Sequence, residues 1–131
     1  MASRHAVDRK AAPAGDGRAK VTLDAMFRID VAQERGGVRV CPVGDLDIAT
    51  RGALRERINE VMAAGARRLI LDLRETTFLD STGLNVAVEA ATRAAHNGTE
   101  FAIIAGPPAV QLVFDVAGLR DRLPFIDVAP G

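Results

Sequence analysis

The alternation of apolar and polar residues predicts that ordered structure begins near Met26, with a β-hairpin. In the first strand, charged residues separate three apolar ones, namely Phe27, Ile29 and Val31. Residues 35–37 read Arg-Gly-Gly, which is a turn signal, and residues 38–43 continue as a second strand. Pro42 has no N–H group for a neighbouring strand, so we expect a bulge or an unpaired position there.

After the hairpin, apolar residues recur every three to four positions instead of every second one, which predicts a helix. Its apolar stripe falls at i, i+4, i+7 and i+8, and comprises Leu54, Ile58, Val61 and Met62. Thr50 or Asp47 can cap the start of this helix, and Gly65 ends it. Residues 69–73 are almost continuously apolar, which is typical of a central strand covered on both faces.

The helix that follows Ser81 has the clearest pattern in the chain. Its predicted buried face comprises Leu84, Ala87, Val88, Ala91, Ala94 and Ala95. Three more elements follow, namely a buried strand at residues 101–105, a short helix opened by two prolines at 107–108, and a last strand at 125–128.

This order of elements predicts one α/β domain. Strands that alternate with helices form a mainly parallel sheet, which we expect to have four to five strands, an antiparallel first strand and three helices. Residues 1–24 are rich in Ala, Gly, Pro and charge and lack apolar periodicity, so we interpret them as a disordered N-terminal extension. The domain is then residues 25–131.

Composition narrows the class of protein. The 17 basic and 17 acidic residues cancel, so the charge balance predicts no direct nucleic-acid partner. No apolar run is long enough to span a membrane, and the single cysteine, Cys41, fits a reducing cytoplasm. Within an apolar run, we interpret Cys41 as a small core residue rather than a reactive thiol.

The most informative segment is residues 77–86, where a serine stands at the start of a helix. The segment before Ser81 and the turn at residues 44–47 follow two parallel strands, so both are expected at the same edge of the sheet. Asp45, Asp47 and Asp80 would then lie near one serine hydroxyl. That hydroxyl can serve as a helix cap, as a nucleophile, or as an acceptor for a phosphoryl group.

Catalysis by Ser81 is the least supported of the three roles. A serine nucleophile needs a base, but His5 lies in the N-terminal extension and His96 lies near the far end of the same helix. Three carboxylates alone are weak evidence for a metal, and no nucleotide motif accompanies them. We therefore expect neither an enzyme nor a cofactor or metal site.

Phosphorylation has a direct physical consequence at this position. It adds roughly −1.5 to −2 charges at neutral pH, which the dipole of the helix partly accommodates. A partner that presents carboxylates or an apolar patch here would lose about 3 kcal/mol of binding free energy, or about a hundredfold in affinity. The modification would thus switch binding without refolding the domain.

Three segments in register resemble the STAS-domain family, specifically the bacterial anti-sigma factor antagonists (anti-anti-sigma factors). Residues 44–47 (Gly-Asp-Leu-Asp) resemble the Gly-Glu-Leu-Asp turn of that family. Residues 78–84 (Phe-Leu-Asp-Ser-Thr-Gly-Leu) resemble its phosphoserine loop, and residues 112–119 resemble its Leu-Phe-Asp-x-x-Gly-Leu helix end. Asn85 departs from the glycine that is common in the family at that position.

The resemblance implies partner switching in stress-response transcription. By resemblance, Ser81 is phosphorylated by an anti-sigma factor that is itself a serine kinase, a GHKL-type ATPase, and a phosphoserine phosphatase reverses the modification. The unmodified protein binds the anti-sigma factor and frees the sigma factor. The implied recognition surface comprises Asp45, Asp47, Asp80, Thr82 and Gly83. The alternative is a STAS regulatory or scaffold module, stressosome-like or transport-associated, that does not act on a sigma regulator.

Overall fold

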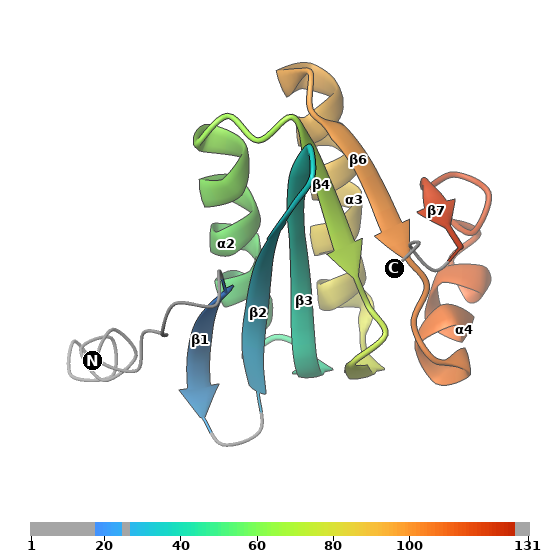
Figure 1. Ribbon diagram of the computed structural model, residues 1–131. Coiled ribbons are helices and arrows are strands. Elements are labelled where there is room, and N and C mark those ends of the chain that lie inside the picture. The colour runs from blue at the N-terminus through green and yellow to red at the C-terminus, as the bar shows by residue number, and fades with distance from the viewer. Residues whose placement is uncertain (1–17, 25–26, 128–131) are drawn as a thin grey trace.

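The computed structural model describes residues 18–24 and 27–127, which form a sheet with helices packed on one of its faces (Figure 1). The strands are β1 (Arg18–Asp24), β2 (Phe27–Glu34), β3 (Gly37–Leu46), β4 (Arg68–Asp72), β5 (Thr76–Leu79), β6 (Glu100–Ile104) and β7 (Phe125–Ile126). Their order across the sheet is β1-β2-β3-β4-β6-β7, and β5 pairs with β3 outside this path. The β1–β2 and β2–β3 pairs are antiparallel and the others are parallel.

The class of fold is as the sequence predicts, but the number of strands is not. The described residues contain seven strands rather than four or five, because β1 and β5 are additional. β1 occupies residues 18–24, so the prediction of a disordered extension as far as residue 24 is wrong for this part. The remainder of that prediction, residues 1–17, lies outside the described residues.

The β2–β3 hairpin closes through Arg35 and Gly36, and Gly36 has a positive φ of 79° that favours glycine. β3 then changes its parallel partner along its length. Residues 38–40 pair with β4, whereas residues 44–46 pair with β5. Pro42 lies opposite Ile29 in the continuous β2–β3 register, so the expected bulge or unpaired position is not found there. It falls between the two parallel stretches of β3, where its missing N–H group interrupts neither parallel ladder.

The three helices in the described part of the chain are α2 (Arg51–Ala63), α3 (Ser81–Asn97) and α4 (Pro108–Val116). In Figure 1, α2 and α3 lie behind the sheet, and α4 lies beside β6 and β7. Gly98 ends α3 in the left-handed conformation, with its N–H group bonded to the Ala94 carbonyl. None of these helices is long and apolar enough to cross a membrane.

One hydrophobic core fills the space between the sheet and the helices. Its fully buried members come from both layers and include Ile29, Val40, Leu54, Leu71, Ile103 and Phe114. The rings of Phe114 and Phe125 meet edge to face with their centroids 5.1 Å apart, which fixes α4 against β7. The parallel strands β3, β4 and β6 all run downward in Figure 1, and β3 ends at the lower edge.

Candidate functional site

The β3–β5 pairing brings the two predicted loops together. Asp45 is level with Phe78 and Leu46 with Leu79, and the Asp80 N–H group donates to the Leu46 carbonyl over 3.4 Å. The segments that follow β3 and β5 are therefore neighbours at one edge of the sheet. This geometry is the one that the sequence predicts.

Asp80 caps α3 and leaves the hydroxyl of Ser81 unused. The carboxylate of Asp80 accepts hydrogen bonds from the Thr82 and Gly83 N–H groups at 2.9 and 3.0 Å. It also accepts the hydroxyl of Thr82 at 2.6 Å. Ser81 is the first helical residue, is exposed, and makes no side-chain hydrogen bond with the described residues. Of the three roles open to this hydroxyl, capping thus belongs to Asp80.

The charged form of Asp80 is favoured by the bonds that make it a cap. The hydroxyl of Thr82, followed by the backbone N–H groups of Gly83 and Thr82, holds the pKa of the Asp80 carboxyl below its ordinary value. At neutral pH this site therefore carries a fixed negative charge one residue before Ser81.

Replacing Asp80 by alanine is expected to lower the free energy of unfolding by about 1 kcal/mol, because α3 loses its cap. The folded-state pKa is depressed, so the contribution is present above the unfolded-state pKa of about 3.9 and is lost as pH falls through the folded value. Urea unfolding at pH 7 and at pH 3 measures this difference. An Asp80→Asn control keeps the cap acceptor, and should stay close to wild type at pH 7. An Asp80→Ala variant as stable as wild type at pH 7 would contradict the assignment.

A second set of hydrogen bonds shapes the loop after β3. The hydroxyl of Thr77 donates to the Asp45 carboxylate at 2.7 Å, which ties β5 to the end of β3. The hydroxyl of Thr50 donates to the Asp45 carbonyl at 2.8 Å and accepts the Asp47 N–H group at 3.0 Å. Thr50 occupies the N-cap position of α2, but its side chain makes no capping bond, and the Asp47 carboxylate accepts from the Ala49 N–H group before the helix. Both capping alternatives from the sequence are therefore wrong. The hydroxyl of Thr50 instead holds the turn that presents Asp45 and Asp47.

Gly83, in the first turn of α3, packs directly against Leu46 at the end of β3. A Cβ atom added to Gly83 would lie 2.7 Å from the Leu46 carbonyl oxygen and 2.9 Å from side-chain atoms of Leu46 and Leu79. Only a residue without a side chain permits this approach. The first turn of α3 and the end of β3 are consequently in direct contact.

Two exposed apolar side chains at the same edge were not singled out from the sequence. Phe78 is 49% exposed and Ile48 is 69% exposed. Alternation along β5 does not reveal the exposure of Phe78, because Thr77 and Phe78 are both exposed between the buried Thr76 and Leu79. Ile48 follows Asp47 in the turn before α2.

The described residues offer Ser81 no catalytic base. His96 is the one histidine among them, and it lies near the other end of α3, about 22 Å away along a helix that rises about 1.5 Å per residue. No group of three or more His, Cys, Asp or Glu residues in the described part of the chain is arranged to hold a metal ion. Among the described residues, no histidine therefore lies within hydrogen-bond reach of the Ser81 hydroxyl.

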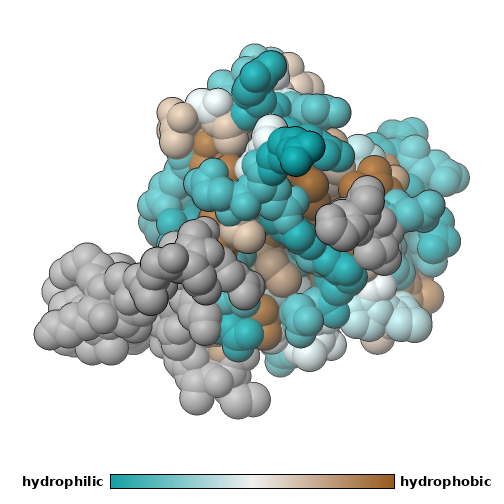
Figure 2. Space-filling view, viewed as in Figure 1, coloured by the Kyte–Doolittle hydropathy of each residue, from teal (hydrophilic) through white to brown (hydrophobic). Residues whose placement is uncertain are grey.

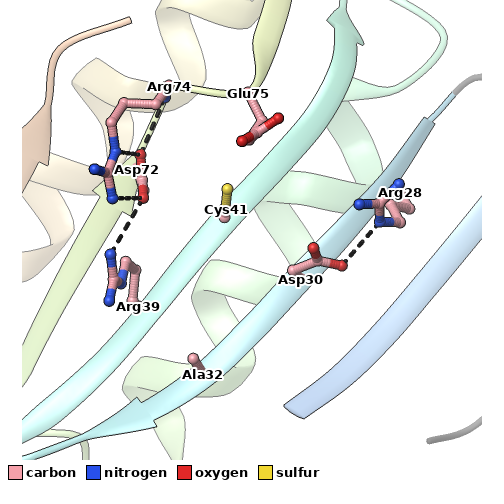
Figure 3. A pocket seen from close by; sticks show the side chains of 8 residues that line it. All are labelled: Arg28, Asp30, Ala32, Arg39, Cys41, Asp72, Arg74 and Glu75. Carbon is pink, nitrogen blue, oxygen red and sulfur yellow. Dashed lines mark hydrogen bonds and ion pairs between the residues drawn. The ribbon is translucent and has the colours of Figure 1, made fainter.

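A separate hollow of about 630 Å³ lies on the face of the sheet opposite α2 and α3. Hydrophilic residues cover most of this face in Figure 2. Figure 3 shows three arginines and three acids around the hollow, namely Arg28, Arg39, Arg74, Asp30, Asp72 and Glu75. Their formal charges cancel, so the hollow has no net preference for an anion or a cation.

Ion pairs within the hollow engage most of these charges. Arg74 donates two hydrogen bonds to the buried carboxylate of Asp72, at 3.0 and 2.8 Å, and Arg28 bonds to Asp30 at 3.1 Å. Burial alone would raise the pKa of Asp72, but the hydrogen bonds and charge of Arg74 outweigh it and lower that pKa. These groups form a structural network across β2, β3 and the end of β4.

Cys41 lies in this hollow rather than in the hydrophobic core, which differs from the prediction of a core residue. Burial, followed by the negative charges of Asp72 and Asp30, raises the pKa of its thiol to about 12. The thiol stays protonated at neutral pH and is a poor nucleophile, as the sequence predicts.

Comparison with known proteins gives one consistent family. The sequence profile of the STAS domain matches residues 28–129. An anti-sigma-B factor antagonist of Bacillus subtilis (strain 168) is 28% identical over 95 residues, which cover 72% of this chain and 86% of that protein. The crystal structure of an anti-sigma factor antagonist from Mycobacterium paratuberculosis superposes with a TM-score of 0.68 at 26% identity, covering 86% of this chain and 87% of that one.

Another protein with a similar structure has been solved both without and with a phosphoryl group. The anti-sigma factor antagonist SpoIIAA in its unphosphorylated form matches with a TM-score of 0.66 at 20% identity, covering 77% of this chain and 88% of that one. The phosphorylated form of the Bacillus protein SpoIIAA matches with a TM-score of 0.61 at 19% identity, covering 77% of this chain and 91% of that one. At these identities the likeness establishes the shared fold.

Proposed function

Because the chain belongs to the STAS domain family, we propose that it is an anti-sigma factor antagonist that phosphorylation of Ser81 switches off. The unmodified protein binds an anti-sigma factor kinase, a GHKL-type ATPase, and thereby releases a sigma factor. Phosphorylated protein no longer binds, and a phosphoserine phosphatase returns it to the active form. The protein acts in the cytoplasm as a binding partner and substrate, without an enzymatic activity of its own.

The exposed hydroxyl of Ser81 is the observation that carries this proposal. Phosphoryl transfer forms a bond between Ser81 Oγ and the γ-phosphorus of ATP, breaks the bond from that phosphorus to the β–γ bridging oxygen, and removes the hydroxyl proton. The oxygen must therefore reach the active site of another protein. Ser81 meets this requirement because Asp80, not Ser81, supplies the cap of α3.

The names of the relatives support the identity of the partner. The Bacillus subtilis relative and the Mycobacterium paratuberculosis protein are both called antagonists of anti-sigma factors. SpoIIAA is known in unphosphorylated and phosphorylated forms. For this chain, we propose that Asp45, Asp47, Asp80 and Thr82 form the surface that the kinase recognises, and that the buried Gly83 holds the two segments of that surface together.

Incubation of the full chain with an anti-sigma factor kinase from the same genome and ATP tests the proposal. Mass spectrometry is expected to find one phosphoryl group, on Ser81, and none in a Ser81→Ala variant. Phosphorylation at another residue, or none with a kinase that binds the protein, would overturn the proposed switch. If the chain is instead a scaffold module of the family, a pull-down should return no GHKL-type ATPase.

A further inference from the structure

Exposed large apolar side chains are rare on the described surface, and half of them lie at the Ser81 edge. Only four are exposed among residues 27–127, namely Ile48, Phe78, Leu112 and Val116. Phe78 lies three residues before Ser81, and Ile48 lies on the neighbouring loop that follows β3. Exposed large apolar side chains at a proposed recognition site are typical of a protein interface.

Local structure does not require apolar residues at these two positions. The turn at Ile48 is held by Asp47 and Thr50, and such turns ordinarily use Asn, Asp, Ser or Gly. Phe78 points outward beside Asp45, while the inward position of β5 is already filled by Leu79. Neither residue belongs to the hydrophobic core. The fold therefore gains little from them.

Charge defines the rest of this surface. The carboxylates of Asp45, Asp47 and Asp80 belong to the same two segments of the chain as Ile48 and Phe78, so acidic groups accompany the exposed apolar ones. A partner that fits here presents an apolar pocket with basic side chains around it. The exposed hydroxyl of Ser81, three residues after Phe78, would face the nucleotide of a kinase.

We propose that Phe78 and Ile48 are the apolar anchors by which the anti-sigma factor kinase binds the unmodified protein. This inference rests on the proposed function, because it names residues that position Ser81 in the complex. Large side chains buried at the centre of an interface dominate binding energy, while charged groups at the rim contribute mainly to orientation and rate of association. The carboxylates of Asp45 and Asp47 take that second role.

Three serine substitutions in the full chain test the inference by calorimetric titration with the kinase. Phe78→Ser and Ile48→Ser are each expected to weaken binding at least tenfold. Val116→Ser is the matched control, because Val116 is 80% exposed at the last residue of α4. This control should bind within twofold of wild type. Ile48 is too exposed to be needed for folding. The affinity measured for Ile48→Ser therefore tests the inference even if Phe78→Ser is destabilised.

Phosphorylation kinetics separate this inference from the proposed function. With Phe78→Ser, the KM of the kinase for the protein should rise at least tenfold while kcat stays near wild type, because the hydroxyl of Ser81 is unchanged. If both variants bind like wild type and Ser81 is still phosphorylated, the anchors are wrong and the proposed function stands. If wild type neither binds the kinase nor is phosphorylated, both are wrong.

Discussion

Phosphorylation of Ser81 is expected to weaken binding to the anti-sigma factor kinase about a hundredfold, equivalent to about 3 kcal/mol. The new group carries roughly −1.5 to −2 charges and replaces a neutral hydroxyl. It would lie against apolar contacts at Phe78 and Ile48 and opposite the phosphates of the nucleotide in the kinase. Both contacts disfavour an added anion, the first through desolvation and the second through repulsion. Isothermal calorimetry on the phosphorylated and unmodified proteins measures the difference.

Two substitutions at Ser81 separate charge from shape. Ser81→Asp adds one charge and should bind more weakly than Ser81→Asn, which has nearly the same shape and no charge. Ser81→Ala should bind the kinase constitutively. Because repulsion between solvent-accessible charges is screened by salt, the penalty in Ser81→Asp should shrink as ionic strength rises. Equal affinities for the phosphorylated and unmodified proteins would contradict the switch.

The second large effect is expected from Gly83→Ala, which should lower the free energy of unfolding by about 2 kcal/mol. Alanine would ordinarily stabilise a helix interior by about 1 kcal/mol relative to glycine. At Gly83, however, the added Cβ would lie 2.7 Å from the backbone carbonyl oxygen of Leu46, which cannot move without shifting β3. An added atom in a packed interior lowers the free energy of unfolding by about 1–3 kcal/mol. The loss is expected in the upper part of this range where a strand must be displaced. Chemical denaturation measures the loss.

Gly52 provides a matched control for that substitution. It is an exposed glycine in α2, and an added Cβ would meet nothing within 4 Å. Gly52→Ala should therefore stabilise the protein by about 1 kcal/mol, the reverse sign from Gly83→Ala. If Gly83→Ala and Gly52→Ala changed the free energy of unfolding in the same direction, the contact between Gly83 and Leu46 would not be the reason that position 83 requires glycine. Gly83→Ala should also weaken kinase binding, because it separates the two loops.

The elements with a long or regular pattern could be predicted from the sequence. The hairpin follows from alternation around a Gly-Gly turn, and α2 follows from a single apolar stripe. β5 was not predicted, because four residues are too few for an alternation to be read, and its pairing with β3 depends on tertiary contact. β1 has alternating apolar residues at Val21 and Leu23, but the preceding Ala, Gly and charged residues dominate the composition of that region.

The buried face of α3 illustrates a second limit. The sequence predicts burial of Val88, Ala91 and Ala95, but Val86 and Ala90 are buried instead and Ala95 is exposed. Apolar residues occur almost all round this alanine-rich helix, so periodicity alone does not select one stripe. Contact with the sheet makes that selection. At the first turn of α3 this contact is close, because Gly83 lies directly against the Leu46 carbonyl.

The edge that brings Ser81 and the acidic loop together was predictable, because the carboxyl ends of parallel strands meet at one edge of a sheet. The cap was predictable only as a choice between Asp80 and Ser81, since either side chain can accept from the first N–H groups. The apolar pair at Ile48 and Phe78 was not predictable as exposed. In the sequence, Phe78 stands beside Leu79 and has the appearance of a core residue.

The direction of β1 has a practical consequence for measuring these interactions. β1 is antiparallel to β2, which is antiparallel to β3, so β1 runs the same way as β3. Arg18 therefore enters the sheet at the end opposite Ser81, roughly 20 Å away for a strand of seven residues at about 3.3 Å each. A fluorophore or a surface tether joined on the amino-terminal side of Arg18 starts far from Ser81, the proposed phosphorylation site, which favours that end for immobilising the protein.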